Sequence, residues 1–287
     1  MPIKSARGRR PYLIGGEDKS IAGEIMLILE RKLFIFDTKT VYFCDYPSDV
    51  DGCDAVTFIC CKNEVDVKGF VRRRDFTAVI DLTQDLDLLW RNMDKTTRYQ
   101  IRRAEGEGVK TNLNQDYDEF HQINKAFRRS KGFGSILNIE TPNAQTMKKY
   151  GTLFTAQYRG EILAGHLYLE DGNHIRLWLS ASKRLEANRD KAALIGRANR
   201  LLHWEAIKYA RKNGIKEFDW GGMWPKEEAE KDKLKYNINS FKLRFGAEVV
   251  PCYVYQRVYS KRYGLAKDIY SLASQGLRKV RAPKGRR

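Results

Sequence analysis

The sequence lacks an uninterrupted apolar run long enough to cross a membrane. Its most apolar early segment, residues 21–36, is interrupted by Glu24, Glu30, Arg31 and Lys32, whereas a spanning helix needs roughly 20 mainly apolar residues. The basic N-terminus also lacks the apolar stretch and the cleavage site of a secretory signal. We therefore expect a cytoplasmic protein, and a peripheral position at the inner face of the membrane stays open.

Cysteine and histidine are sparse and scattered. The five cysteines show no CxxC spacing, and their odd number favours reduced thiols over a disulfide framework. The four histidines form neither an HExxH motif nor a Cys/His cluster. From these absences we predict no metal site and no resident cofactor.

Positive charge, by contrast, is abundant. The 287 residues include 53 Lys and Arg against 36 Asp and Glu, which gives a net charge of +17. Residues 1–10 contain four basic side chains and residues 269–287 contain six, and neither end contains an acidic one. Such ends attract phosphate, in RNA or in anionic lipid, but they are equally typical of a solubilising tail.

Predicted strands and helices alternate along the chain. β-Branched and aromatic runs predict strands over 32–46, 54–61, 76–83, 152–160, 161–183 (a hairpin turning at Asp171-Gly172-Asn173), 215–223 and 249–259. Periodicity and capping residues predict helices from Thr83 to Gly106 or Gly108, and over 116–133, 141–151, 192–214 and 263–280. The charged run 226–235 is expected to be a loop. The order within 150–258 resembles that of a GNAT (Gcn5-related N-acyltransferase) domain.

Four segments also resemble, in the same order, segments of the Fem family. They are VIDLTQDLDLLWRNMDKTTRYQIRRAEGEGVK, GEILAGHLYLEDG, LLHWEAIKYARKNGIKEFDWGGM and FKLRFGAEVVP. The resemblance covers about residues 75–260. It implies an α/β fold of two tandem GNAT-like halves with the first one shortened: residues 1–133 with a basic helix, and residues 134–287 with a closing helix and a basic tail.

Membership of this family implies an aminoacyltransferase. Fem-type enzymes use aminoacyl-tRNA as a co-substrate and form an amide on an amine acceptor, so the resemblance implies tRNA and an amine acceptor as partners. The acceptor would be a peptidoglycan precursor or a small molecule. A catalytically silent module that binds RNA or a membrane is a further alternative on the same fold.

An acyl-CoA-dependent N-acyltransferase, acting on a cell-envelope or sugar amine, is the main alternative. GNAT enzymes hold the CoA pyrophosphate on backbone N–H groups at a helix N-terminus. The corresponding segment, residues 193–198, contains only one glycine, Gly196, inside a helical pattern. We therefore disfavour CoA as the donor, and we expect Gly196 to serve close packing of helix against sheet.

A basic stripe is predicted on the helix over 83–108. Lys95, Arg98 and Arg102 share one face because they lie at positions i, i+3 and i+7. With Tyr99 as a stacking surface, this face is a candidate for binding phosphates of a donor RNA. The alternative is a solvated face whose arginines pair with Glu105 and Glu107.

The candidate catalytic residues are Lys242 and Phe241, in NINSFKLRFGAE. The Fem resemblance places this Phe-Lys pair at the reaction centre. There the Lys242 ammonium would stabilise the oxyanion, and the Phe241 carbonyl would help to position the ammonium of the amine acceptor. Without the resemblance, Lys242 reads as a surface lysine at a strand entrance. Nearby side chains complete the candidate substrate-binding set: Trp220, Tyr236 and Asn239. Asp219 is expected to cap a turn, and His203 to be a buried structural histidine.

Overall fold

The computed structural model describes residues 26–130 and 142–269, and its strands form a single ten-stranded sheet. The strands are β1 (Leu27–Leu33), β2 (Phe36–Tyr42), β3 (Ala55–Cys61), β4 (Val71–Asp81), β5 (Lys110–Leu113), β6 (Thr152–Tyr158), β7 (Glu161–Glu170), β8 (His174–Ser182), β9 (Glu217–Gly222) and β10 (Glu248–Val258). Across the sheet they lie in the order β1-β2-β3-β10-β4-β9-β8-β7-β6-β5. Two neighbouring pairs, β2–β3 and β8–β9, are parallel.

Helices cover both faces of the part of the sheet that runs from β9 to β5. They are α1 (Leu86–Asn92), α2 (Lys95–Gly106), α3 (Tyr117–Ser130), α4 (Ala144–Tyr150), the 3-10 helix η1 (Lys183–Glu186), α5 (Arg189–Lys212), α6 (Lys226–Lys231) and α7 (Lys233–Leu243). On one face α5 packs against β6 and β7 and is covered by α2, whereas α3 and α4 pack on the other face. None of the helices in the described ranges is long and apolar enough to cross a membrane.

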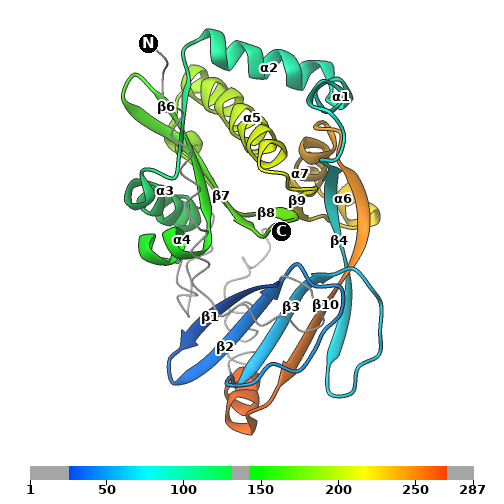
Figure 1. Ribbon diagram of the computed structural model, residues 1–287. Coiled ribbons are helices and arrows are strands. Elements are labelled where there is room, and N and C mark those ends of the chain that lie inside the picture. Colours follow the sequence, from blue (N-terminus) through cyan, green and yellow to red (C-terminus); the bar gives the residue numbers. More distant parts are fainter. Residues whose placement is uncertain (1–25, 131–141, 270–287) are drawn as a thin grey trace, which may run out of the picture.

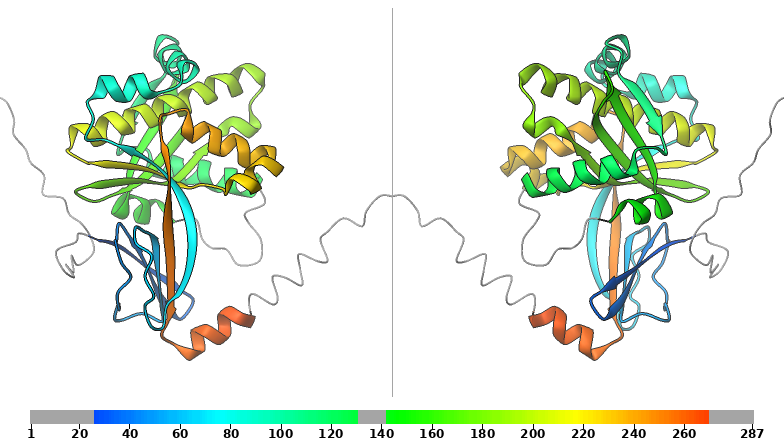
Figure 2. Two further views of the ribbon diagram at one scale, coloured as in Figure 1. Left: turned by 90° about the vertical axis from the view of Figure 1, so that its right-hand side faces the viewer. Right: turned by 90° about the vertical axis from the view of Figure 1, so that its left-hand side faces the viewer.

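Two long antiparallel strands, β4 and β10, connect the parts of the molecule. Each has 11 residues, and they pair from Glu248↔Val79 to Gln256↔Val71. In Figures 1 and 2 they run side by side from the helix-covered part to the strand layer formed by β1–β3. That layer has a small core of its own around Val41, Phe58 and Tyr255.

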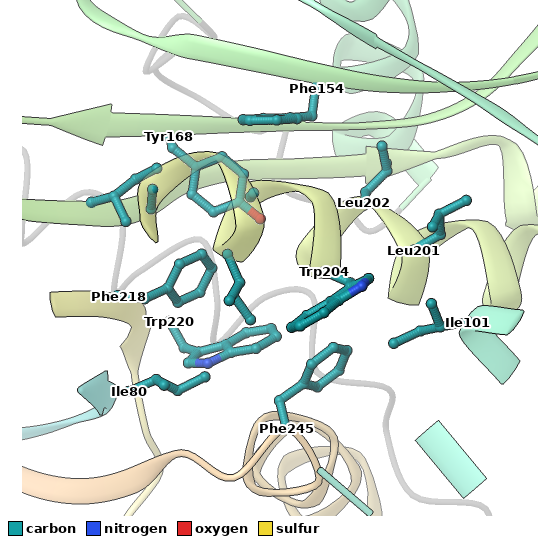
Figure 3. Close-up of a cluster of buried hydrophobic side chains, with 14 of the residues drawn as sticks. Ile80, Ile101, Phe154, Tyr168, Leu201, Leu202, Trp204, Phe218, Trp220 and Phe245 are labelled. Carbon is teal, nitrogen blue, oxygen red and sulfur yellow. The ribbon is translucent and has the colours of Figure 1, made fainter. Parts of the chain in front are cut away.

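The main core lies between α5 and the sheet. Leu201, Leu202 and Trp204 of α5 pack with Phe218 and Trp220 of β9 in one cluster (Figure 3). The apolar side chains of α5 recur at helical spacing, so one face of this 24-residue helix is buried along its length. The core therefore fixes β9 beneath α5, and β9 contributes to the site described below.

Several predicted elements are confirmed. The predicted meander is the β6–β7–β8 set, with Arg159 and Gly160 at φ 49° and 83° in the first turn. A two-residue hairpin with both residues at positive φ suits the right-handed twist of the flanking strands. The long helix ends just before Gly214, which has φ 79°, and the β8–α5–β9 crossover is parallel as expected.

The single helix predicted from Thr83 to Gly106 or Gly108 is wrong. The chain forms α1 and α2, separated by Met93 and Asp94 in extended conformations. The reason is a second N-cap: Asp85 accepts a hydrogen bond from Leu88 N, and Asp94 accepts one from Thr97 N. An aspartate inside an apparently continuous helical pattern thus starts a new helix.

The loop predicted for residues 226–235 is also wrong. This segment forms α6 and the first turn of α7, with Pro225 before α6 and Asp232 accepting hydrogen bonds from the first turn of α7. Acidic side chains in the first turn of α6 complement the helix dipole. As a consequence Lys242 lies in the last turn of a helix and not at a strand entrance.

The mixed α/β, GNAT-like fold is confirmed, but two tandem halves with a shortened first half are not. Strands from residues 26–81 and from the rest of the chain share one sheet, and no helix of the described residues lies within 26–81. The closing helix predicted over 263–280 is confirmed as far as residue 269, where the described residues end. The rest of that helix, the predicted boundary between residues 133 and 134 and both basic ends lie outside the described residues. These remain predictions.

Candidate active site

The parallel strands β8 and β9 separate after a short shared ladder. They pair at His174↔Glu217, Ile175↔Phe218 and Arg176↔Asp219. Beyond Arg176, β8 continues to Ser182 beside β7, and β9 continues to Gly222 beside β4. Two parallel strands that part in the middle of a sheet leave backbone carbonyls available to a third group. In this protein that group is a lysine.

Lys242 inserts its ammonium at the end of β9. Its Nζ donates to the carbonyl oxygens of Gly221 at 3.1 Å and Gly222 at 2.6 Å, and the residue is only 9% exposed. An ammonium has three N–H donors, and among the described residues no third acceptor bonds to it. The expectation of a surface lysine is therefore wrong: the side chain is buried and oriented by two fixed carbonyls.

The helix terminus also exposes a carbonyl next to this lysine. The N–H groups that follow α7 bond to the carbonyls of Ser240, Lys242 and Leu243. None of these N–H groups donates to the carbonyl of Phe241. This carbonyl lies in the last turn of α7, where carbonyls lack intrahelical donors. The Phe241 carbonyl, which the sequence predicts as an acceptor for the ammonium, therefore receives no hydrogen bond from a backbone donor of the described residues.

Burial changes the pKa of Lys242 more than any neighbouring charge does. It lowers the pKa of the ammonium from 10.5 to about 8. The negative charge of Asp219 opposes this shift, and the positive charge of Arg176 adds to it. A lysine with a pKa near 8 is still mostly protonated at neutral pH, but it holds its proton far less firmly than an exposed lysine.

Asp219 accepts hydrogen bonds from three donors, which belong to β4, β8 and β9. Its carboxylate accepts hydrogen bonds from Thr77, from the guanidinium of Arg176 and, at 2.7 Å, from Gly221 N. The bond from Gly221 confirms that it caps the turn. The ion pair with Arg176, 8% exposed, had no sequence signal, because the two residues are 43 positions apart and meet only through the β8–β9 ladder.

An aromatic cluster closes the α5 side of the separated strands. The ring of Trp220 lies 4.7 Å from Phe245 and 4.2 Å from His203, and His203 lies 5.6 Å from Phe241 (centroid distances; Figure 3 shows Trp220 and Phe245). Trp220 is 2% exposed, and its indole N–H is buried without a partner among the described residues. His203 is buried as expected and accepts or donates a 2.8 Å hydrogen bond with the Tyr168 hydroxyl. Burial lowers the pKa of His203, so its ring is neutral.

Two cavities are found, and one of them reaches the Arg176–Asp219 pair. One, of about 310 Å³, lies between α3 and the end of β8, and its lining includes Ser182 and Lys183 but not Lys242. The other is small, about 20 Å³, and is lined by Cys60, Arg176 and Asp219 among others. Over the described ranges, no group of three His, Cys, Asp or Glu side chains is arranged to hold a metal.

Comparisons with known proteins bear on the fold. Residues 91–233 match the model of the acetyltransferase (GNAT) domain. Over this segment the chain is similar to GNAT-type acyltransferases. No curated protein matches the sequence.

The Fem-like fold is shown by solved structures of low sequence identity. FemX has a TM-score of 0.55 at 13% identity, covering 90% of this chain and 88% of that one. The C-terminal domain of a putative lysylphosphatidylglycerol synthetase from Agrobacterium fabrum has a TM-score of 0.53 at 13% identity, covering 88% and 86%. L-PGS from Bacillus licheniformis has a TM-score of 0.51 at 16% identity, covering 84% and 83%.

Within this GNAT domain, the segment considered for CoA is helical. Residues 193–198 lie inside α5, so their N–H groups are used within the helix and do not form a phosphate cradle. The expectation that Gly196 serves helix–sheet packing is wrong. A Cβ on Gly196 would meet only two arginine side chains, Arg184 Nη1 at 3.6 Å and Arg200 Nη1 at 3.8 Å.

The predicted basic stripe lies on α2. Lys95, Tyr99 and Arg102 are exposed, whereas Arg98 is partly buried and donates to the Arg91 carbonyl at 3.3 Å. The Arg102 guanidinium lies 5.3 Å from the Trp90 ring. The predicted carboxylate pairing does not involve the stripe, because Glu107 pairs with Arg103 and with Arg197 of α5.

The remaining candidates lie elsewhere on α7. Tyr236 is 55% exposed, whereas Lys242 is buried. The Asn239 amide bonds in both directions with the backbone of Trp224, at 3.1 Å and 2.8 Å. Asn239 therefore fastens α7 to the segment after β9, which indirectly positions Lys242 over the β9 carbonyls.

Proposed function

We propose that this protein is a Fem-type aminoacyltransferase. It moves an amino acid from aminoacyl-tRNA to an amine of a peptidoglycan precursor or of a small molecule, and it forms an amide. The observation that supports this most is the buried Lys242 ammonium, held by two carbonyls with a third donor free where β8 and β9 part. The Fem resemblance assigns the reaction centre to the same residue.

The chemistry requires a fixed cation more than it requires a strong base. The aminoacyl ester is already activated, so the acceptor amine attacks its carbonyl carbon, and negative charge develops on the carbonyl oxygen. A preorganised donor in a water-poor site stabilises this oxyanion more than it stabilises the ground-state ester. The third N–H of Lys242 is suited to donate to it. The tetrahedral intermediate then collapses, the C–O bond to the ribose breaks, and the ribose oxygen leaves as a hydroxyl with the proton that the attacking nitrogen gives up.

The Phe241 carbonyl has a complementary role. After attack, the acceptor nitrogen carries a positive charge until it loses a proton. A carbonyl oxygen that no backbone N–H occupies can accept a hydrogen bond from this nitrogen and orient it. Adjacent residues of one helix turn therefore supply a donor for the oxyanion and an acceptor for the ammonium.

The acyl-CoA alternative is favoured by one observation, the match of residues 91–233 to an acetyltransferase domain. It is disfavoured by the helical conformation of residues 193–198. A donor test separates the two. The full-length protein is incubated with an amine-rich wall-precursor and metabolite extract, and with either a pool of labelled aminoacyl-tRNAs or labelled acetyl-CoA.

We expect label in a base-stable amide with aminoacyl-tRNA, and no such label when the tRNA is first digested with RNase. Label from acetyl-CoA alone would overturn the proposed donor. The matched variants are Lys242→Met and, as a control, Lys233→Met, which removes an exposed lysine from the other end of the same helix.

A further inference from the structure

Three arginines from separate elements converge over the middle of α5. Arg184 lies in η1, Arg200 in α5, and Arg244 is the C-cap residue of α7. The Nη1 atoms of Arg184 and Arg200 both lie within 4 Å of the point where Gly196 would carry a Cβ. We call these three residues the arginine cluster. The glycine leaves the space between the guanidinium groups free of a side chain.

Arg200 is the best-defined member of the cluster. Its Nη1 donates to the Gly196 carbonyl at 2.8 Å, and its guanidinium lies 5.1 Å from the centre of the Phe241 ring. Burial lowers the pKa of Arg200, and the positive charges of Arg244 and Arg184 lower it further. The cluster is therefore close enough for its members to repel one another.

No carboxylate of the described residues forms an ion pair with the arginine cluster. The charge of Asp94 opposes the lowering of the Arg200 pKa, but the Asp94 carboxylate already caps α2 by accepting a hydrogen bond from Thr97 N at 3.0 Å. The contrast with Arg197 is direct, because this residue, next to Gly196, pairs with Glu107 at 2.7 Å. The fold thus neutralises one arginine of α5 and leaves its neighbours without a counter-charge.

We propose that the arginine cluster binds a phosphate group of the acyl donor. Guanidinium groups form forked, charge-assisted hydrogen bonds to phosphate, and such an anion would remove the repulsion within the cluster. The Phe241 ring places the site next to the reaction centre, because it contacts Arg200 while the following residue, Lys242, reaches β9. This assignment to the donor rests on the proposed function.

The cluster replaces the missing backbone cradle. Residues 193–198 cannot offer free N–H groups to a phosphate because they are helical. Side chains anchored on η1 and α5 provide donors over the same stretch of α5 instead. Both donor classes contain a phosphate that this chemistry recognises: a phosphodiester near the 3′ end of tRNA, or the pyrophosphate of CoA.

Binding measurements test this without any turnover. The probes are inorganic pyrophosphate, CoA and a short uncharged RNA hairpin ending in the tRNA acceptor sequence, titrated into the full-length protein by calorimetry. The Arg184→Gln/Arg244→Gln double variant removes two exposed members. Its control, Lys125→Gln/Arg129→Gln, removes the same charge from exposed positions on α3, on the other face of the sheet.

We expect the double variant to bind its probe at least about tenfold more weakly, since each lost guanidinium–phosphate contact costs roughly that factor. The control should bind as the unmodified protein does. The slope of log affinity against log salt for the RNA should fall by roughly 0.7–0.9 per phosphate contact removed. Gly196→Leu, which fills the space between the guanidiniums and keeps the net charge, should weaken binding as well.

Equal losses in the double variant and the control would overturn the proposal, because they would indicate attraction by net charge alone. Failure of all three probes to bind the unmodified protein would also overturn it. Which of CoA and the RNA responds to the double variant identifies the source of the phosphate. An active Lys242→Met variant would refute the proposed catalytic role of Lys242 but would not change the binding result. Failure of the proposed function and failure of the phosphate site are therefore distinguishable.

Discussion

Two arginines, the buried Arg176 and the half-buried Arg200, lie near the site where β8 and β9 part, and they differ in how their charge is balanced. Arg176 is paired with Asp219. Burial lowers the pKa of Arg176, but the negative charges of Asp219, Cys60 and Tyr42, with Asp219 the largest of the three, together outweigh burial, so the pKa is raised. Arg200 has no carboxylate partner among the described residues, and its pKa is lowered by burial and by two other arginines. A compensated charge of this kind holds the fold together, whereas an uncompensated one is available to a ligand.

The largest effect is expected at the compensated arginine. Arg176→Met leaves the Asp219 carboxylate buried without its counter-charge, which typically costs about 3–5 kcal/mol in the free energy of unfolding. The control is Arg72→Met, which breaks the ion pairs of Arg72 with Asp66 and Glu64, whose side chains are 95% and 50% exposed, and it should cost at most about 1 kcal/mol. Urea unfolding followed by tryptophan fluorescence measures both. Equal losses would mean that Arg176 and Asp219 do not form the compensated pair described here.

Lys242→Met should have the next largest effect, and on rate. Loss of one preorganised oxyanion donor typically reduces turnover by roughly 100–1,000-fold. The unfolding midpoint should change little, since removing a buried charge offsets the loss of its two hydrogen bonds to β9 carbonyls. A variant that kept full activity would refute the role of Lys242, and Lys233→Met monitors general damage to α7.

The pH dependence of turnover should show the titration of Lys242. Its pKa is lowered from 10.5 to about 8, so the ammonium is present below pH 8 and is lost above it. Turnover that needs the ammonium should fall by about tenfold per pH unit above the pKa. A weakly basic acceptor such as hydroxylamine stays neutral over this range, so Lys242 is the group that titrates. A rate that rises through pH 8 would instead identify Lys242 as a general base.

The smallest effect is expected for Arg200→Met. This change removes a half-buried charge that has no carboxylate partner among the described residues, together with one hydrogen bond and one contact with Phe241. These terms oppose each other, so we expect the free energy of unfolding to change by no more than about 1 kcal/mol. Urea unfolding of Arg200→Met and Arg176→Met under the same conditions compares the contributions of the two arginines to stability. A loss as large as that of Arg176→Met would show that Arg200 is structural.

Local signals were sufficient for the regular elements of the GNAT domain. The β6–β7–β8 meander and α5 follow from alternation, from helical periodicity and from turn residues such as Arg159-Gly160. Local signals failed where two interpretations competed. Asp94 inside a helical pattern is an N-cap, and the charged run after Pro225 is helical because its side chains suit helix termini.

The candidate site was only partly predictable. Lys242 and Phe241 were reachable through the resemblance to the Fem family, not through any local pattern around them. The partners of Lys242 were not predictable, because the Gly221 and Gly222 carbonyls meet it across a gap that exists only once β8 and β9 part. The arginine cluster was missed for the same reason: its members come from three elements.

The sequence by itself determined most of the regular elements, the excess of positive charge and the resemblance to the Fem family, because periodicity, capping, composition and short motifs are properties of neighbouring residues. The tertiary structure decided which charges are neutralised. Whether an arginine lies beside a carboxylate or has no carboxylate partner depends on strand register and on helix packing between distant residues. That choice separates Arg176, a structural residue, from Arg200, which we assign to the donor phosphate.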